Sequence, residues 1–200
     1  TNGLIIVSSG FIPEPVRPMT AFRPGANGDI TLKEGETKSE HIVWRQNTAA
    51  PYIPSPTAYG DYVYVVVDPG FIACLEAKTG KEVWRFNTIP GPGETGHETW
   101  PTNTDAWMRG GAAVWVTGSY DPKLNLVYWG TGNPGPDFYG DARPGDNLYS
   151  NSVIALDPDT GKLKWHYQFT PHDEFDYDAA QVPVLADLQW KGSLRAVMLW

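Results

Sequence analysis

The sequence predicts an all-β protein of the β-propeller type, and three observations lead to that fold class. The 21 glycines and 18 prolines make up 39 of the 200 positions, above the roughly 12% of average usage, and both residues interrupt helices. Nine Trp, ten Tyr and seven Phe suit short strands whose aromatic side chains fill a thin core between sheets. A sequence template also recurs with a period of about 40 residues, which is typical of propeller blades.

The repeat is clearest in residues 73–84 and 155–165, which share an apolar strand, a Thr-Gly-Lys turn and a second strand with a tryptophan. Trp84 and Trp165 lie 81 residues apart, and a degenerate copy places Trp44 40 residues before Trp84. We interpret the longer spacing as two periods with one divergent blade between them. Each copy is expected to be a hairpin that ends at its tryptophan, and the tryptophan is expected to lock neighbouring blades together.

Alternation of apolar residues predicts three further hairpins, each formed by two short strands that follow one another along the chain. The predicted hairpins are 4–8 with 19–23, 62–67 with 71–75, and 114–118 with 126–129 across the turn 119–123.

Three long segments interrupt this rhythm. Residues 87–109 and 132–149 have no strong periodicity and exceed ordinary connector length, so we expect functional loops that flank a common region. Residues 24–40 are polar, rich in glycine and of mixed charge, and they are expected to form a solvated loop.

The charge and hydropathy patterns argue against a nucleic-acid partner and against a membrane span. Fifteen basic and 23 acidic residues leave a net charge of −8, and no basic run could follow a phosphate backbone, so we expect no nucleic-acid partner. The apolar stretches are far shorter than the ~20 residues that span a bilayer, and the N-terminus lacks the basic region of a signal peptide. The single cysteine, Cys74, stands between apolar neighbours and is predicted to be a small buried core residue.

Five motifs in the second part of the chain carry a resemblance to a known family. In their order and spelling, they resemble the pyrroloquinoline quinone-dependent alcohol dehydrogenases of the methanol and ethanol dehydrogenase type, and the resemblance covers residues 84–200. The motifs are TIPGPGE at 88–94, WVTGSYDP at 115–122, YWGTGNPGP at 128–136, RPGDNLY at 143–149 and TPHDEFDYD at 170–178.

This resemblance implies an eight-bladed propeller, of which this chain supplies four to five blades. It implies oxidation of a primary alcohol by hydride transfer to metal-bound pyrroloquinoline quinone, in the periplasm, with a c-type cytochrome as the electron acceptor. Residues 84–200 would carry the cofactor and metal site.

Four residues match family positions with a role. Trp115 resembles the aromatic residue on which the planar quinone stacks, although an ordinary blade tryptophan is the alternative. Asn133 would offer a neutral oxygen to the metal, or else cap its own turn. Asp176 resembles the catalytic aspartate, which binds the metal and takes the alcohol proton. Asp178 is a second acid in the same motif, and the alternative for both acids is a solvated acidic run.

Alternation in an extended segment would place Asp176 and Asp178 on one face and Asp173 on the other. Two carboxylates on one face repel each other unless a cation holds them. An acid two residues after the catalytic aspartate resembles the pattern of the subgroup of this family that uses a lanthanide. The metal is therefore expected to be a lanthanide ion or Ca²⁺, and Asp178 favours the trivalent ion.

The first 83 residues depart from the family. The segment 62–70 contains no metal-binding glutamate, Asp68 is its only acid, and Ala113 stands where a hydroxyl side chain often contacts the quinone. Residues 1–83 instead resemble non-catalytic quinone-like repeat propellers, similar to the outer-membrane assembly lipoprotein, and are expected to form blades without site residues. The chain resembles a fragment or a hybrid, and alone it is expected to oxidise alcohols poorly or not at all. The alternative function is a non-enzymatic propeller scaffold that binds proteins.

Overall fold

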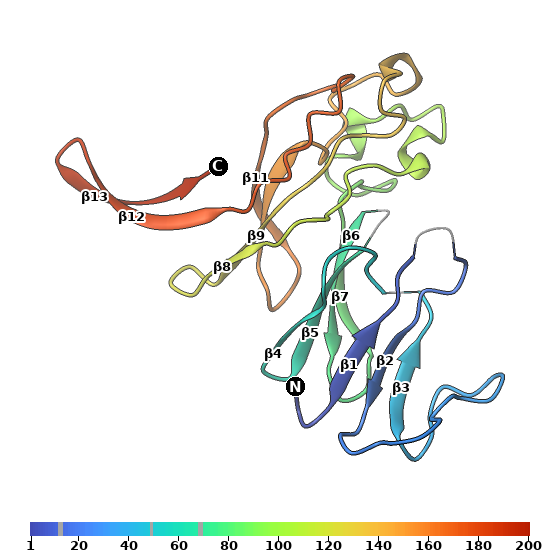
Figure 1. Cartoon of the computed structure of the whole chain (residues 1–200). Coiled ribbons are helices and arrows are strands. Elements are labelled where there is room, and N and C mark those ends of the chain that lie inside the picture. Colours follow the sequence, from blue (N-terminus) through green and yellow to red (C-terminus); the bar gives the residue numbers. More distant parts are fainter. Residues whose placement is uncertain (12–13, 49, 68–69) are drawn as a thin grey trace.

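The computed structural model describes residues 1–11, 14–48, 50–67 and 70–200. It is almost entirely β: three antiparallel sheets follow one another along the chain, and a two-stranded hairpin extends away from the third (Figure 1). The prediction of an all-β, partial propeller is confirmed, since each sheet packs face to face on the next as propeller blades do.

The strands of each sheet pair in sequence order. The first sheet contains β1 (Ile5–Ser8), β2 (Met19–Phe22) and β3 (Ile42–Gln46). The second contains β4 (Thr57–Tyr59), β5 (Tyr62–Val67), β6 (Phe71–Glu76) and β7 (Glu82–Asn87). The third contains β8 (Ser119–Asp121), β9 (Leu126–Gly130), β10 (Ser152–Leu156) and β11 (Leu163–Gln168). The terminal hairpin consists of β12 (Val184–Trp190) and β13 (Ser193–Leu199).

Helical structure in the described residues is limited to three short 3₁₀ turns, all within the long loops. They are η1 (His97–Thr99), η2 (Ala106–Arg109) and η3 (Gly140–Ala142).

The repeat tryptophans occupy equivalent places in successive sheets. Trp44, Trp84 and Trp165 are each the third residue of the last strand of their sheet, β3, β7 and β11. The expectation that they end their strands is wrong, because each strand continues for two or three residues beyond the indole. The divergent blade expected between Trp84 and Trp165 is also absent from residues 85–164, because long loops before β8 and between β9 and β10 fill the extra length.

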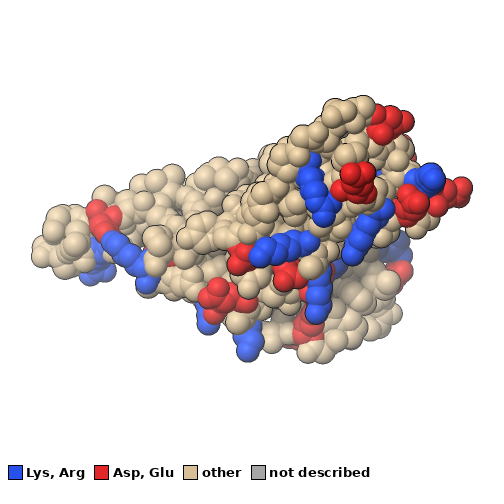
Figure 2. All heavy atoms as spheres, turned by 90° about the horizontal axis from the view of Figure 1, so that it is seen from below, with Lys and Arg blue, Asp and Glu red and all other residues tan. Residues whose placement is uncertain are grey.

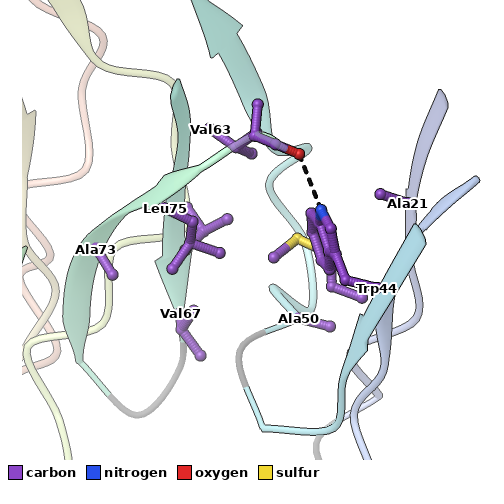
Figure 3. Packing of buried hydrophobic residues seen from close by; sticks show 10 residues of the cluster. Ala21, Trp44, Ala50, Val63, Val67, Ala73 and Leu75 are labelled. Carbon is purple, nitrogen blue, oxygen red and sulfur yellow. Dashed lines mark hydrogen bonds between the residues drawn. The ribbon is translucent and has the colours of Figure 1, made fainter. Parts of the chain in front are cut away.

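Two of these tryptophans bind the following blade, as predicted. The indole Nε1 of Trp44 donates to the carbonyl oxygen of Ala77 at 2.8 Å, a bond drawn in Figure 3. Its ring lies over Gly80, whose missing Cβ would stand 2.6 Å from the indole. Trp84 repeats the arrangement one blade later, where Nε1 donates to Pro158 at 2.9 Å and the ring lies over Gly161. The glycine of the Thr-Gly-Lys turn therefore serves both the turn, with a positive φ, and the seat for the preceding tryptophan.

Apolar side chains from facing sheets form the interfaces between the blades. Figure 3 shows Trp44 and Ala21 of the first sheet facing Val63, Leu75 and their neighbours of the second. The second and third sheets meet through a cluster that includes Cys74. Cys74 is 1% exposed, which confirms its assignment to the core.

One predicted hairpin is displaced. Residues 114–118 were expected to be the strand before β9, but the strand is β8, which begins at Ser119 and pairs Ser119 with Tyr128. Asp121 ends this strand because its Oδ1 accepts the backbone N–H groups of Lys123 and Leu124 and so fixes the turn there. Residues 114–118 therefore lie outside the strand, and Gly118 packs against Tyr128 and Trp129 of β9, where a Cβ would collide with both residues.

The two long loops, which were expected to flank a common region, contact one another directly. Tyr149 donates its hydroxyl to the carbonyl of Thr95 at 2.9 Å, Trp100 donates its indole N–H to the carbonyl of Leu148, and Asn147 N–H donates to Thr99 at 3.1 Å. The first loop leads from β7 of the second sheet toward β8 of the third, and the second loop joins β9 to β10. The two loops gather at one end of the third sheet (Figure 1).

Basic and acidic side chains lie next to one another over the face shown in Figure 2. Among the described residues, none of the helices is long and apolar enough to cross a bilayer.

Candidate functional site

Three of the four predicted site residues meet at the end of the third sheet. The indole Nε1 of Trp115 donates to Oδ2 of Asp178 at 2.9 Å, and the backbone N–H of Asn133 donates to Oδ1 of the same carboxylate at 2.6 Å. Asp178 therefore joins the loop before β8 to the segment that follows β9. Trp115 as a whole is 39% exposed, and this bond fixes the edge of its ring.

Glycine makes this approach possible. A Cβ on Gly132 would stand 2.9 Å from Oδ1 of Asp178, and a Cβ on Gly111 would meet the backbone of residues 133–135. The carbonyl of Ala113 accepts the N–H of Gly132 at 2.8 Å, which holds the loop before β8 against this turn. The Gly-Thr-Gly-Asn motif thus brings main chain and carboxylate together, as its composition predicts.

Asp176 is exposed and lies in the left-handed region, with φ of 62°. The prediction that Asp176 and Asp178 lie on one face of an extended segment is therefore wrong, because a positive φ at Asp176 breaks the alternation of side chains there. The two acids are nevertheless coupled. The pKa of the Asp176 carboxyl is raised by loss of hydration and then by the negative charges of Asp178, Asp137 and Asp173.

The donor set fits a hard cation. No ion pair among the described residues includes Asp176 or Asp178, so their charges repel without a basic side chain to offset them. An amide and two carboxylates are the oxygen ligands that Ca²⁺ and trivalent ions take. Within the described ranges, no three His, Cys, Asp or Glu side chains gather closely enough to hold a metal by themselves. The side-chain amide of Asn133 donates its Nδ2–H to the carbonyl of Pro134 at 3.2 Å, as a residue that caps its own turn would, and its amide oxygen remains a candidate ligand. Asp68 lies outside the described residues.

The sequence reasoning missed the residues beneath this site. Asp173 was assigned to the far face of an extended segment, yet it is buried and accepts three N–H bonds. Arg143 was recognised only as part of the motif at 143–149, and Asn151 was given no role. Both residues are fully buried. The signal that could have identified Asp173 is its residue type within a loop. An aspartate there often accepts the backbone N–H two positions later, which here is that of Phe175.

The fold and these motifs define a propeller of the quinoprotein type, and comparison with known proteins agrees. The family profile described as PQQ, "Glucose/ethanol/alcohol dehydrogenase, beta-propeller domain", matches residues 17–199. The chain therefore belongs to this family.

Individual relatives are dehydrogenases of alcohols. The chain is 37% identical over 186 residues to quinohemoprotein alcohol dehydrogenase ADH IIB of Pseudomonas putida, a match that covers 82% of this chain and 27% of that protein. It is 37% identical over 212 residues to the lanthanide-dependent methanol dehydrogenase of Methylorubrum extorquens, with coverage of 89% and 35%. The crystal structure of quinohemoprotein alcohol dehydrogenase from Comamonas testosteroni superposes with a TM-score of 0.75 at 30% identity, covering 98% of this chain and 30% of that one. The chain thus spans about a third or less of the length of these proteins.

Proposed function

We propose that this chain is the site-bearing part of a quinoprotein that oxidises a primary alcohol. The observation that carries the proposal is the contact of Trp115 and Asn133 with opposite oxygens of Asp178, beside a second acid that has no basic partner. A protein-binding scaffold would gain nothing from two uncompensated acids beside a glycine-rich turn. Membership of the alcohol dehydrogenase family supports the same reading.

Each site residue has a distinct role in this proposal. The exposed surface of Trp115 forms the floor on which a flat quinone stacks, and the bond to Asp178 keeps the ring from rotating. The amide oxygen of Asn133 and the carboxylates of Asp176 and Asp178 hold the cation. When bound, quinone and cation supply the hydride acceptor and the charge that polarises it. An oxygen of Asp176 accepts the hydroxyl proton of the alcohol as the carbinol hydrogen departs with its electron pair.

Asp178 favours a trivalent ion over Ca²⁺ in this site. Each oxygen of its carboxylate accepts one N–H bond, which leaves a further lone pair on each for a metal. A second anionic ligand beside Asp176 lowers the energy of a trivalent ion more than that of a divalent one, because the attraction scales with the charge.

The remaining parts of the proposal concern the whole protein. Residues 84–200 hold the site, whereas residues 1–83 supply blades without site residues. The resemblance further implies a periplasmic location and electron transfer to a c-type cytochrome.

Terbium luminescence tests the metal site in the 200-residue chain. Because the Trp115 indole contacts Asp178, excitation of tryptophan should sensitise emission from Tb³⁺ bound there. We expect Asp178→Ser to weaken Tb³⁺ binding at least tenfold, and Trp115→Phe to reduce the sensitised emission with less effect on affinity. Asp121→Asn is the matched control, because Asp121 is the last residue of β8, where its carboxylate holds the following turn, and the change should leave both signals unchanged.

Turnover tests the chemistry. In a protein that carries this chain within a complete propeller, oxidation of ethanol with a dye acceptor should require quinone and a lanthanide or Ca²⁺. Asp176→Ala should lower kcat by about 10²–10⁴-fold, which is the usual contribution of a general base. Absence of both quinone-dependent turnover and Tb³⁺ binding would favour the protein-binding scaffold instead.

A further inference from the structure

The Asp173 carboxylate holds the main chain on both sides of Asp176. It is 1% exposed. Its Oδ1 accepts the N–H of Phe175 at 2.9 Å, and its Oδ2 accepts the N–H of Tyr177 at 2.8 Å. The amide Nδ2 of Asn151 donates a third bond to Oδ2 at 2.7 Å. Since the two backbone donors flank Asp176, the position of this carboxylate sets the path of the chain through that residue.

Asp176 needs such support because of its backbone conformation. Its φ of 62° is in the left-handed region, which is unfavourable for a residue with a Cβ and persists only where neighbouring contacts enforce it. A substitution at Asp173 that weakens the two bonds its carboxylate accepts from Phe175 and Tyr177 would let the chain relax toward negative φ. The Asp176 side chain would then leave from a different direction, away from Asp178.

A buried arginine fixes the other side of this loop. Arg143 is fully buried, and its Nη2 donates to the carbonyls of Asp173 and Asp137, the latter at 2.9 Å. Its Nη1 donates to Oδ1 of Asn147 at 2.9 Å, and its Nε donates to the carbonyl of Pro136 at 3.1 Å. One guanidinium therefore ties the loop that follows Asn133 to the loop that carries Asp176.

Asn151 supports the same arrangement. Its Oδ1 is the one buried side-chain nitrogen or oxygen atom in the described part of the chain that has no hydrogen-bond partner. Its own N–H donates to the carbonyl of Gly132 at 2.9 Å, one residue before Asn133. The amide is thus committed to Asp173 while its carbonyl oxygen stays unpaired, which indicates that the charged bond to Asp173 dominates its orientation.

We propose that Asp173, with Asn151 and Arg143 behind it, is a positioning residue that sets the direction of the Asp176 carboxylate relative to Asp178 and Asn133. The inference rests on the proposed function, because it assigns Asp176 to the metal. Asp173 itself is not a metal ligand in this scheme, because its carboxylate is buried beneath the site and accepts N–H bonds from three residues, whereas Asp176 is exposed.

The test compares Asp173→Asn with Asp176→Ala in the 200-residue chain, using Tb³⁺ alone. Luminescence lifetimes in H₂O and D₂O count the water molecules on the bound ion. Loss of Asp176 as a ligand should admit about one more water, because hard cations refill a vacant oxygen position from solvent. Asp173→Asn should reproduce this additional water and weaken Tb³⁺ binding about tenfold, although Asp176 and Asp178 are both present. An asparagine at 173 keeps the size of the side chain but removes its charge and one acceptor oxygen.

Two controls separate positioning from general destabilisation. Asp121→Asn also removes a carboxylate that accepts two backbone N–H bonds, but in the turn after β8, and it should leave the hydration count unchanged. If Asp173→Asn folds poorly, Asn151→Ala removes one donor to the same carboxylate and should give a smaller shift in the same direction. Hydrogen exchange at the amides of Phe175 and Tyr177 should accelerate at least tenfold in Asp173→Asn, with or without metal.

The outcomes distinguish the two proposals. If Tb³⁺ binds and Asp176→Ala adds a water but Asp173→Asn does not, the positioning role is wrong and the proposed function stands. If Asp176→Ala leaves hydration and affinity unchanged, or the unaltered chain does not bind Tb³⁺, the proposed function fails, and this inference fails with it.

Discussion

Cys74 illustrates how burial can dominate the chemistry of one residue. It is 1% exposed and faces Tyr64 across β5 and β6, and burial raises the pKa of its thiol from 9.0 to about 11. The native chain should therefore resist iodoacetamide near pH 8, where an exposed thiol is partly ionised and reacts. Mass spectrometry should find Cys74 unmodified in the native chain and alkylated in guanidinium, and rapid native labelling would contradict the burial.

The same shift makes a prediction about stability. The folded state favours the neutral thiol, so its contribution is fully present below pH 9 and is lost as the pH rises toward about 11. The burial-raised pKa of Tyr64, about 12, extends the loss to higher pH. Urea unfolding of Cys74→Ala should show a shallower decline between pH 9 and 11 than the unaltered chain. Parallel curves for the two would contradict this assignment.

Two glycines with positive φ differ in what would surround an added Cβ. Gly80 (φ 70°) lies beneath Trp44, and Gly60 (φ 57°) has no heavy atom within 4 Å of an added Cβ. Gly60→Ala should cost about 1 kcal/mol from backbone conformation alone. Gly80→Ala should cost a further ~1–3 kcal/mol, because the methyl group collides with the indole. Thermal unfolding of the two variants measures the difference, and equal costs would show that the Trp44 contact is unimportant.

At the scale of the element, the contribution of a strand to stability depends on whether the next blade covers its tryptophan. Trp84 is 8% exposed and bonded to Pro158 in the next blade, whereas Trp165, at the equivalent position of β11, is 41% exposed. No hydrogen bond to the Trp165 indole occurs among the described residues. Trp84→Ala should therefore destabilise the chain by about 3–5 kcal/mol, and Trp165→Ala by about 1 kcal/mol. Chemical denaturation of both variants tests this, and similar losses would mean that β11 is covered in solution.

The elements also show where sequence reasoning succeeds and where it stops. The tryptophan template predicts the blades because a repeated indole needs a repeated seat, and Gly80 and Gly161 supply it. It did not predict the spacing of the blades, since the loops around β8 add length that no packing period restricts. β8 itself was displaced because Asp121 fixes the turn through its side chain, which an apolar alternation does not register.

Sequence reasoning likewise predicted one part of the candidate site and missed another. The contacts of Trp115 and Asn133 with Asp178 lie between segments whose motifs were recognised, and the roles of these residues stay predictions. The support from Asp173 was missed because its partner Asn151 comes from a distant segment, and because a left-handed residue breaks the alternation used to orient the acids.

At the scale of the whole molecule, stability should be graded along the chain. All five residues of β10 are buried between neighbouring strands and sheets, whereas most residues of β12 and β13 are exposed, and these two strands pair only with each other. Contact with the third sheet rests on a few groups, such as the Lys123–Asp187 ion pair at 2.6 Å and the packing of Leu185 and Met198. An isolated two-stranded hairpin is only marginally stable in water.

Native-state hydrogen exchange should therefore resolve two levels of protection. Amides of β5, β6 and β10 should exchange only through global unfolding, and those of β12 and β13 should exchange at least a hundredfold faster, through local opening that costs about 3 kcal/mol less. The exposed Lys123–Asp187 pair adds little, so Lys123→Ala should leave this difference nearly unchanged. Equal protection of β12 and β10 would mean that the hairpin unfolds together with the blades, and that its packing through the partly buried Leu185 and Met198 is much stronger than this prediction assumes.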